Sequence, residues 1–305
     1  FTNRAVENYK TSSNENIDLM EIKLDVNGNF VKQYVNGTLW GLYRGSSGPS
    51  ILQCMHMALE KILLEFSEVL EPKNLRPIFL KILSESKSAS LTSIVCSLTL
   101  AYPDKFYNIS LILFKTIVLF RIDLSRYSAE FHIKSTISIG YGLDEQKDLL
   151  YADERIKSSE YKHRITSLES LCLMYQFNGV KGFTEKENEH FINKIYSIID
   201  SHKSIYSGSS NPDFDHNILL LSRMDRRNLK SKITQQENNK YLVEFTPKEL
   251  PEKIKKDSED TISQINEEFK YTPLKLWANF IHNTGNDKNE KYDKNPLQAL
   301  IETKQ

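Results

Sequence analysis

The sequence predicts a mainly α-helical protein, built from stacked antiparallel helical hairpins with one or two short β-hairpins. Between Ser50 and Phe120, apolar residues recur every three or four positions, which is typical of amphipathic helices. Prolines mark short turns within this block. Near the N-terminus, apolar and polar residues alternate on either side of an Asn-Gly pair, which indicates a β-hairpin.

The first β-hairpin is expected in an N-terminal segment, residues 1–48. Asn27-Gly28 suits the two left-handed positions of a type I′ turn, and this turn pairs Leu24 with Val31. The strand before it alternates in character, with Met20, Ile22, Leu24 and Val26 on one face and Glu21, Lys23 and Asp25 on the other.

The end of this segment, residues 36–43, is expected to add a third strand or a turn into the next helix. Three aromatic side chains lie near the hairpin: Phe30, Trp40 and Tyr43. We expect them to pack the hairpin onto the helices, and an exposed aromatic platform is the alternative.

Residues 49–125 are expected to form an apolar core of helical hairpins. The first helix starts at Ser50, and its apolar stripe is Ile51, Met55, Ala58, Leu59, Ile62, Phe66 and Leu70. Pro72 and Pro77 bracket a short break before the second helix. The third helix, 89–101, is apolar almost all round and should be buried on all sides. The fourth starts at Pro103 and runs to about residue 120.

Residues 126–282 are more polar. Mixed charges over 143–164 predict solvated helices, and 165–177 reads as an apolar helix. Thr184 and Glu187 form a capping box, which predicts a helix over 185–202.

The next helix is expected to begin near Pro212, and a second hairpin is expected at 230–246, where Ile233 and Tyr241 to Val243 flank a polar turn. A charged amphipathic helix follows Pro251. Residues 283–305 read as a polar linker and the start of a further helix.

Composition limits the function classes. Forty basic residues balance forty acidic ones, so the chain has no net charge that would attract nucleic acid or an anionic membrane. Cys54, Cys96 and Cys172 lie far apart, which excludes a cysteine zinc finger and indicates reduced, intracellular thiols. The longest charge-free apolar run, 88–103, is shorter than the roughly 20 residues of a membrane span. Both ends look cut, so we expect a fragment of a larger protein.

The glycine-rich turn "YRGSSGPSILQ" invites comparison with phosphate-binding loops. A Walker A loop needs a lysine, and Pro49 stands where it would be wanted and lacks the N–H that would hold a phosphate. We therefore interpret the stretch as a helix start, with Ser47 or Gly48 as the cap. An anion site at the helix N-terminus is the alternative, and it would use Arg44, Gly45, Gly48 and Ser50.

Two stretches contain a histidine close to another side chain that could take part in catalysis or metal binding. His56 lies at the flank of the apolar stripe and is two positions from Cys54, so the two cannot form a nucleophile–base pair, and we expect a histidine at the edge of the core. Asp213, Asp215 and His216 could ligate a divalent metal, while acids in the first turn of a helix also simply complement its dipole. No cofactor is predicted.

The stretch "SRMDRRNLK" concentrates basic residues: Arg223, Arg226, Arg227 and Lys230. Arg223 and Arg227 are expected to lie one helical turn apart, and so are Arg226 and Lys230, which predicts a basic ridge. The ridge would contact phosphates or an acidic partner, or it would be a solvated helix end.

Paired amphipathic helices with Pro-marked turns between Ser50 and Phe120 resemble HEAT or armadillo repeats. "GLYRGSSGPSILQ", "SRMDRR" and "KLWANF" are similar to stretches of large bacterial ATP-binding proteins, including STAND-type proteins of antiviral defence. The resemblance implies a helical region beside a nucleotide site that lies outside this chain, and it carries over no catalytic residue.

Our leading hypothesis is a noncatalytic, cytoplasmic scaffold that binds another protein or another domain of its own protein, and that serves as a sensor or regulatory part of an NTPase. One alternative is a metal-dependent enzyme domain around Asp213, Asp215 and His216. Another is nucleic-acid binding through the Arg223–Lys230 ridge. We expect no membrane partner.

Overall fold

The computed structural model describes residues 2–12, 19–45, 48–138, 156–206, 212–235 and 241–264. As predicted, the fold is mainly α-helical with two antiparallel β-hairpins. The N-terminal elements are α1 (Thr2–Ser12), β1 (Met20–Val26), β2 (Asn29–Val35), α2 (Gly37–Gly41), η1 (Leu42–Arg44), α3 (Ser50–Val69), α4 (Pro72–Glu85), α5 (Ala89–Ala101), α6 (Pro103–Phe114) and α7 (Ile117–Ser138). The later elements are α9 (Leu168–Asn178), α10 (Glu185–Tyr206), α11 (Pro212–Met224), η2 (Arg226–Asn228), β3 (Leu229–Gln235) and β4 (Tyr241–Pro247).

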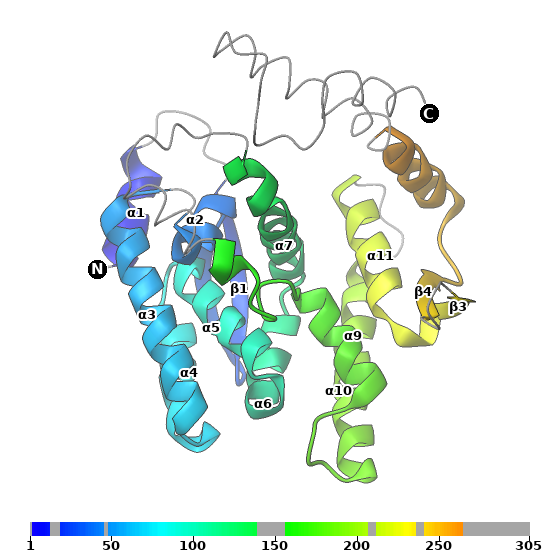
Figure 1. The fold of residues 1–305 in the computed structure, drawn as a ribbon, viewed down its shortest axis with the longest axis horizontal. Helices are drawn as coiled ribbons and strands as arrows, with labels where there is room; N and C mark the ends of the chain where they lie inside the picture. The colour runs from blue at the N-terminus through cyan, green and yellow to red at the C-terminus, as the bar shows by residue number, and fades with distance from the viewer. Residues whose placement is uncertain are drawn as a thin grey trace, which may run out of the picture.

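The helices form two groups that share one core. In Figure 1, α3 to α7 and the β1–β2 hairpin occupy one side, and α9, α10 and α11 the other. A single cluster of buried side chains runs from Leu24 of β1 through α5 and α6 to Ile199 of α10 and Leu221 of α11. A helix over 252–264 follows β4 and lies above the β3–β4 hairpin in Figure 1, at the same end of the molecule.

The first hairpin has the predicted register, with Leu24 opposite Val31. Asn27 and Gly28 adopt positive φ of 54° and 90°, which is what a two-residue turn of this type requires. Gly28 N–H donates to the Asp25 carboxylate at 2.7 Å. The apolar face of β1 is buried at Ile22, Leu24 and Val26, so this hairpin is part of the core.

Residues 36–44 turn into a helix, and they do not form a third strand. The Asn36 side chain caps α2 by accepting a hydrogen bond from Leu39 N–H at 2.9 Å. Trp40 and Tyr43 are almost completely buried, as expected of aromatic residues that pack a hairpin onto helices, whereas Phe30 is 74% exposed at the hairpin tip.

Two predicted boundaries in the helical block are wrong. Pro77 does not mark a break, since α4 continues through it to Glu85. The cost of the missing backbone bond is offset by full burial of Leu75, Phe79 and Leu83. The predicted fourth helix is two helices, α6 and α7, because the chain turns at Lys115 and Thr116, whose side chains bond to Asp25 and to the Lys23 carbonyl.

Helix α5 is buried on all sides, as its composition predicts, and every residue from Thr92 to Thr99 is buried. Its hydroxyl groups bond internally, as when Thr99 Oγ1 donates to the Val95 carbonyl at 2.8 Å. Within the described parts of the chain, no helix is both long and apolar enough to cross a membrane.

The second half follows the predicted local signals. Thr184 and Glu187 form the capping box of α10, with Glu187 accepting from Thr184 N–H at 2.8 Å. Helix α9 ends at Gly179, whose φ is 69°. The second hairpin pairs Ile233 with Val243. The predictions for 139–155 and for 265–305 lie outside the described residues.

Candidate functional site

Helix α3 has its apolar side outward. Its buried residues are His56, Glu60, Leu63 and Ser67, three of which are polar. Five of its exposed apolar residues, which we call the α3 stripe, are Ile51 (70% exposed), Met55 (48%), Ile62 (47%), Phe66 (46%) and Val69 (77%), and Met57 (46%) is exposed beside them. The expectation that this stripe packs into the core is therefore wrong, because the other face of the helix is the one that meets α5.

Each buried polar side chain of α3 has a hydrogen-bond partner. His56 Nδ1 lies 2.7 Å from the Leu52 carbonyl and Nε2 lies 2.9 Å from Ser90 Oγ. Burial lowers the pKa of His56, so the ring is neutral at pH 7, with Nδ1 donating to Leu52 and Nε2 accepting from Ser90. Glu60 accepts from Ser97 and from Arg164. These hydrogen bonds offset the free-energy cost of removing the polar face of α3 from water.

Glu60 belongs to a buried ionic centre made of three arginine–carboxylate pairs. The pairs are Arg44–Glu130, Arg126–Asp123 and Arg164–Glu60, and all six side chains are less than 10% exposed. They come from η1, α3, α7 and residues 156–167, which are far apart in the sequence. Arg164 also lies 4.9 Å from the centre of the Tyr43 ring.

The ionic centre ties α7 to the start of α9. Arg126 donates to the carbonyls of Arg164 at 2.7 Å and Thr166 at 2.6 Å. Asp123 accepts from Leu168 N–H at 2.8 Å, next to the α9 cap at Ser167. The buried charges thus satisfy a helix terminus and the loop before it.

Neither the histidine beside the ionic centre nor the two buried cysteines are suited to acid–base or thiolate chemistry. Burial, together with the charges of Arg164, Arg44 and Arg126, lowers the pKa of His163 to about 3, far below the value near 7 that suits a general base. Burial raises the pKa of Cys96 and of Cys172, so neither is a thiolate at pH 7. The geometry favours a structural role.

This histidine predicts a pH dependence of stability. The unfolded chain binds a proton at His163 near pH 6.5, whereas the folded chain does so only near pH 3. The stabilising contribution is therefore fully present above pH 6.5 and declines as the pH falls, by up to about 1.4 kcal/mol per pH unit. We expect His163→Phe to flatten the pH profile of urea unfolding between about pH 6.5 and pH 4. A pH profile that keeps its slope in His163→Phe would contradict the lowered pKa of His163.

Arg44, in the glycine-rich turn, has its guanidinium paired with Glu130. Arg44 Nη2 donates to Glu130 at 2.8 Å, and Nε contacts the other oxygen of the same carboxylate. Gly45 and Gly48 have positive φ, and Pro49 occupies the cap position before Ser50. The guanidinium of Arg44 is thus bidentate to an internal carboxylate, while Ser47 lies outside the described residues.

The structure describes two of the three side chains that the sequence proposes as metal ligands. Asp215 accepts from Lys253 Nζ at 2.7 Å, and His216 is exposed. The side chain of Asp213 lies outside the described residues. Among the side chains that the structure describes, no three of His, Cys, Asp or Glu are grouped as metal ligands would be.

The basic stretch 223–230 is not a helical ridge. Helix α11 ends at Met224, Asp225 caps η2, and Lys230 lies in β3, so the predicted one-turn spacing does not hold. Arg223 donates to Glu169 at 2.7 Å. Arg226 lies over the Phe177 ring, and Arg227 donates to Asp225 at 2.9 Å and to Asp200.

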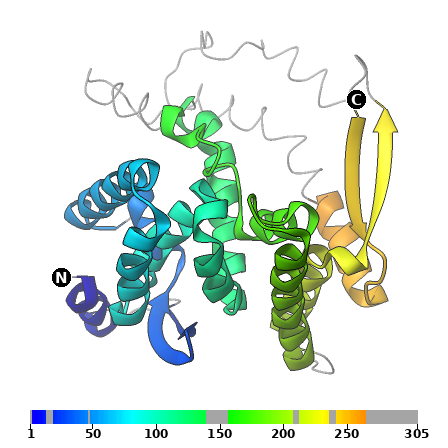
Figure 2. The ribbon, with the colours of Figure 1, turned by 90° about the horizontal axis from the view of Figure 1, so that it is seen from below.

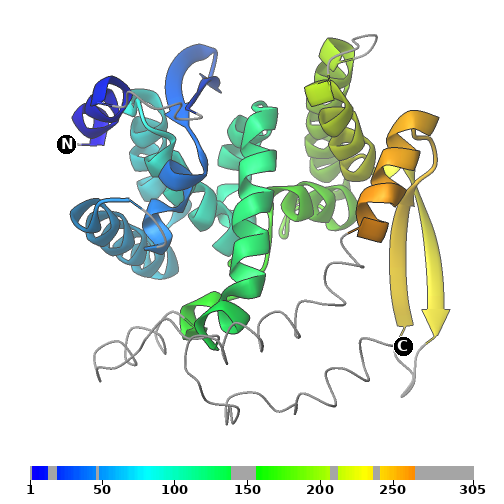
Figure 3. The same ribbon diagram turned by 90° about the horizontal axis from the view of Figure 1, so that it is seen from above.

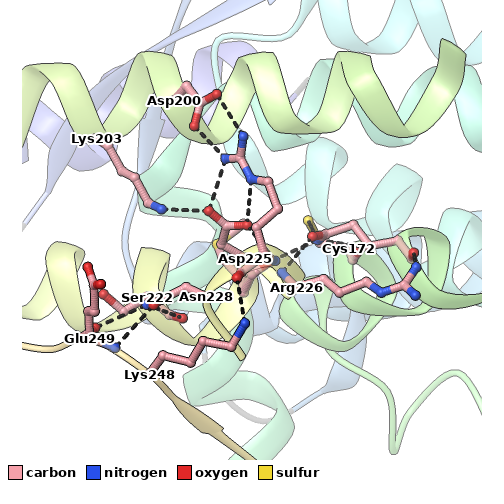
Figure 4. A network of polar contacts seen from close by, with 12 residues as sticks. Cys172, Asp200, Lys203, Ser222, Asp225, Arg226, Asn228, Lys248 and Glu249 are labelled. Carbon is pink, nitrogen blue, oxygen red and sulfur yellow. Dashed lines mark hydrogen bonds and ion pairs between the residues drawn. The ribbon is translucent and has the colours of Figure 1, made fainter. Parts of the chain in front are cut away.

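Asp225 is the centre of this second polar network, which Figure 4 shows. Burial would raise its pKa, but hydrogen bonds from Arg227 and Lys203 outweigh burial and lower it. Asn228 donates to the Glu249 carbonyl at 3.1 Å and accepts from Glu249 N–H at 3.2 Å. The network joins α10, η2 and the chain after β4. An open groove beside it has Arg223 and Arg227 on its wall, opposite Glu169 and Asp200, so its charge is balanced.

No protein-family model and no curated protein sequence matches the chain. The candidate site therefore rests on geometry. Sequence reasoning missed the buried ionic centre, because Arg44 and Glu130 are 86 positions apart and Glu60 and Arg164 are 104 apart. The signal that could have found it is the polar stripe His56, Glu60 and Ser67 opposite the apolar one.

Proposed function

We propose that this chain is a noncatalytic helical interaction domain that binds a helix of another protein, or of another domain, along the α3 stripe. The observation that supports the proposal is the orientation of α3, which buries Glu60 and His56 and exposes Ile62 and Phe66. Turning the helix the other way would bury the apolar residues and solvate the charge. Monomeric proteins rarely expose large contiguous apolar patches, and such patches usually mark interaction sites.

The dimensions of the stripe suit a helical partner. Helix α3 has 20 residues, so the surface is about 30 Å long. Ile51, Met55, Ala58, Ile62, Phe66 and Val69 follow one another at spacings of three or four, which is the pattern of a helix seam. A second amphipathic helix with the same spacing could lie along it and insert its side chains between these residues.

Charge favours one end of the partner over the other. The half of α3 before Glu60 has no Asp, Glu, Lys or Arg, whereas the other half exposes Lys61, Glu65 and Glu68. The two glutamates lie toward the negative end of the helix dipole, beyond Lys61. A partner helix whose basic residues lie beside this end is therefore favoured. The three cysteines are free, which is compatible with a reducing compartment, and we propose the cytoplasm.

Binding can be tested with a synthetic amphipathic peptide of about 20 residues, with leucines at seam spacing and lysines toward one end. We expect Ile62→Asp to weaken its binding at least about tenfold in fluorescence anisotropy, because a charge would enter an apolar contact. Ile233→Asp, at an exposed isoleucine of β3 (66% exposed, against 47% for Ile62), is the matched control and should bind like the unchanged chain. Equal binding by the Ile62 variant, or equal binding of a scrambled peptide, would rule out the α3 stripe.

A further inference from the structure

The β3–β4 hairpin stands apart from the core. It forms a separate two-stranded sheet at the end of the molecule opposite α1 (Figures 2 and 3). Its base is held by Asn228 and by Lys248, whose backbone N–H donates to the Asn228 carbonyl at 2.7 Å. Beyond Leu229, every residue of β3 is exposed, and β4 is exposed from Tyr241 to Thr246.

The two faces of this hairpin differ. Residues directly opposite each other share a face, so Ile233 lies with Val243, and Tyr241 and Phe245 lie on the same side. These four residues are 44–66% exposed, and the ring centroid of Phe245 lies 4.9 Å from that of Phe177. The opposite face carries Lys230, Lys232, Leu242 and Glu244. An isolated two-stranded hairpin is marginally stable in water, so an apolar face that the described residues leave about half exposed would gain stability from a partner.

The two edges of the hairpin differ in charge. Within the described residues, neither edge pairs with another strand. The β3 edge carries Lys230 and Lys232, and lysines on an edge strand oppose pairing with another strand. The β4 strand, "YLVEFTP", has no lysine or arginine, and its Glu244 already faces Lys232 of the neighbouring strand. The β4 edge is therefore the one open to pairing.

We propose that β4 pairs with β4 of a second copy of this chain, in an antiparallel register centred on Val243. In this register Tyr241 lies opposite Phe245 of the partner subunit, and Leu242 lies opposite Glu244 of the partner subunit. No like charges face each other, and the lysines of both β3 strands are at the outer edges of a four-stranded sheet. Pairing of β3 with β3 centred on Lys232 would instead place two lysines opposite each other.

The register brings apolar residues of both copies onto one face. A two-fold axis perpendicular to the sheet keeps the apolar faces of both hairpins on the same side. Val243 then lies opposite Val243 of the partner subunit, at the axis. Aromatic pairs across strands are among the stabilising pairs of β-sheets, and the two Tyr241–Phe245 pairs belong to this class. Four strands with a shared apolar face also exceed the minimum that an independent sheet needs.

Sedimentation velocity over a range of concentrations tests the proposal with the whole chain. The unchanged chain should dimerise, and Val243→Lys should weaken the dimer at least about tenfold, because two lysines meet at the axis. Ile233→Lys is the matched control, on the same face but on the outer strand, and it should leave the dimer in place. Ile62→Asp should also leave it in place, since the α3 stripe is a different surface.

A charge-pair experiment separates lost pairing from lost folding. Val243→Lys and Val243→Glu should each be monomeric, and their mixture should form a heterodimer, because opposite charges then meet at the axis. A chain that stays monomeric at all concentrations would overturn the proposal. Loss of the dimer in Ile233→Lys as well would indicate face-to-face stacking and would overturn edge pairing, as would a mixture that forms no heterodimer.

Discussion

Replacing Arg164 with methionine is expected to lower the free energy of unfolding by about 3–5 kcal/mol, because it leaves Glu60 buried without its cation. The Glu60 side chain is 5% exposed and would keep only the Ser97 hydroxyl as a partner. Methionine has a similar length, so loss of packing against Tyr43 is small by comparison. Urea unfolding measures the change.

The same experiment has two controls. Lys73→Met removes the cation of an exposed pair with Glu71, whose side chains are 76% and 68% exposed, and should cost less than about 1 kcal/mol. The double variant Glu60→Leu/Arg164→Met should recover most of the loss, since replacing a buried ion pair with apolar residues is often neutral. A small loss in Arg164→Met, or no recovery in the double variant, would show that the pair is not buried as described.

The second large loss of stability is expected on replacing Phe79. A phenylalanine of the neighbouring helix α3 provides the control. Phe79 is fully buried in α4. Its ring centroid lies 4.8 Å from that of Phe106, and the two rings are arranged edge to face. Phe79→Ala should cost about 3–5 kcal/mol through lost burial and a cavity. Phe66→Ala, on the α3 stripe and 46% exposed, should cost less than about 1 kcal/mol.

These two variants test the orientation of α3, on which the proposed function depends. If Phe66→Ala destabilises the fold as much as Phe79→Ala, then the stripe is part of the core and the interaction surface does not exist. If Phe66→Ala is neutral for unfolding and weakens binding of the amphipathic peptide, then stability and binding are carried by different phenylalanines of neighbouring helices.

Much of the fold could be predicted because its signals are local. The turn at Asn27-Gly28, the capping box at Thr184, and the all-round apolar α5 each depend on residues within one or two turns of the chain. The break between α6 and α7 could not be predicted in this way. It depends on Thr116 and Lys115 bonding to the β1 strand, about 90 positions earlier.

The candidate site was less predictable than the fold for the same reason. The sequence indicates a basic cluster at Arg223, Arg226 and Arg227. The partners Glu169 and Asp200 are distant in sequence, and the helix ends at Met224, so the sequence does not show these ion pairs. The sequence also shows Arg44 beside a glycine-rich turn, and only the tertiary structure places Glu130 against it.

By itself, the sequence determined that α3 is an amphipathic helix with an apolar stripe and that β3–β4 is an amphipathic hairpin, because periodicity depends only on the order of residues. It could not determine which face of each element is buried. That was decided by the tertiary structure, in which Arg164, Ser90 and Ser97 satisfy the polar face of α3 and leave the apolar face in water. A polar face can be buried when distant groups complete its hydrogen bonds, and no local pattern reports whether they do.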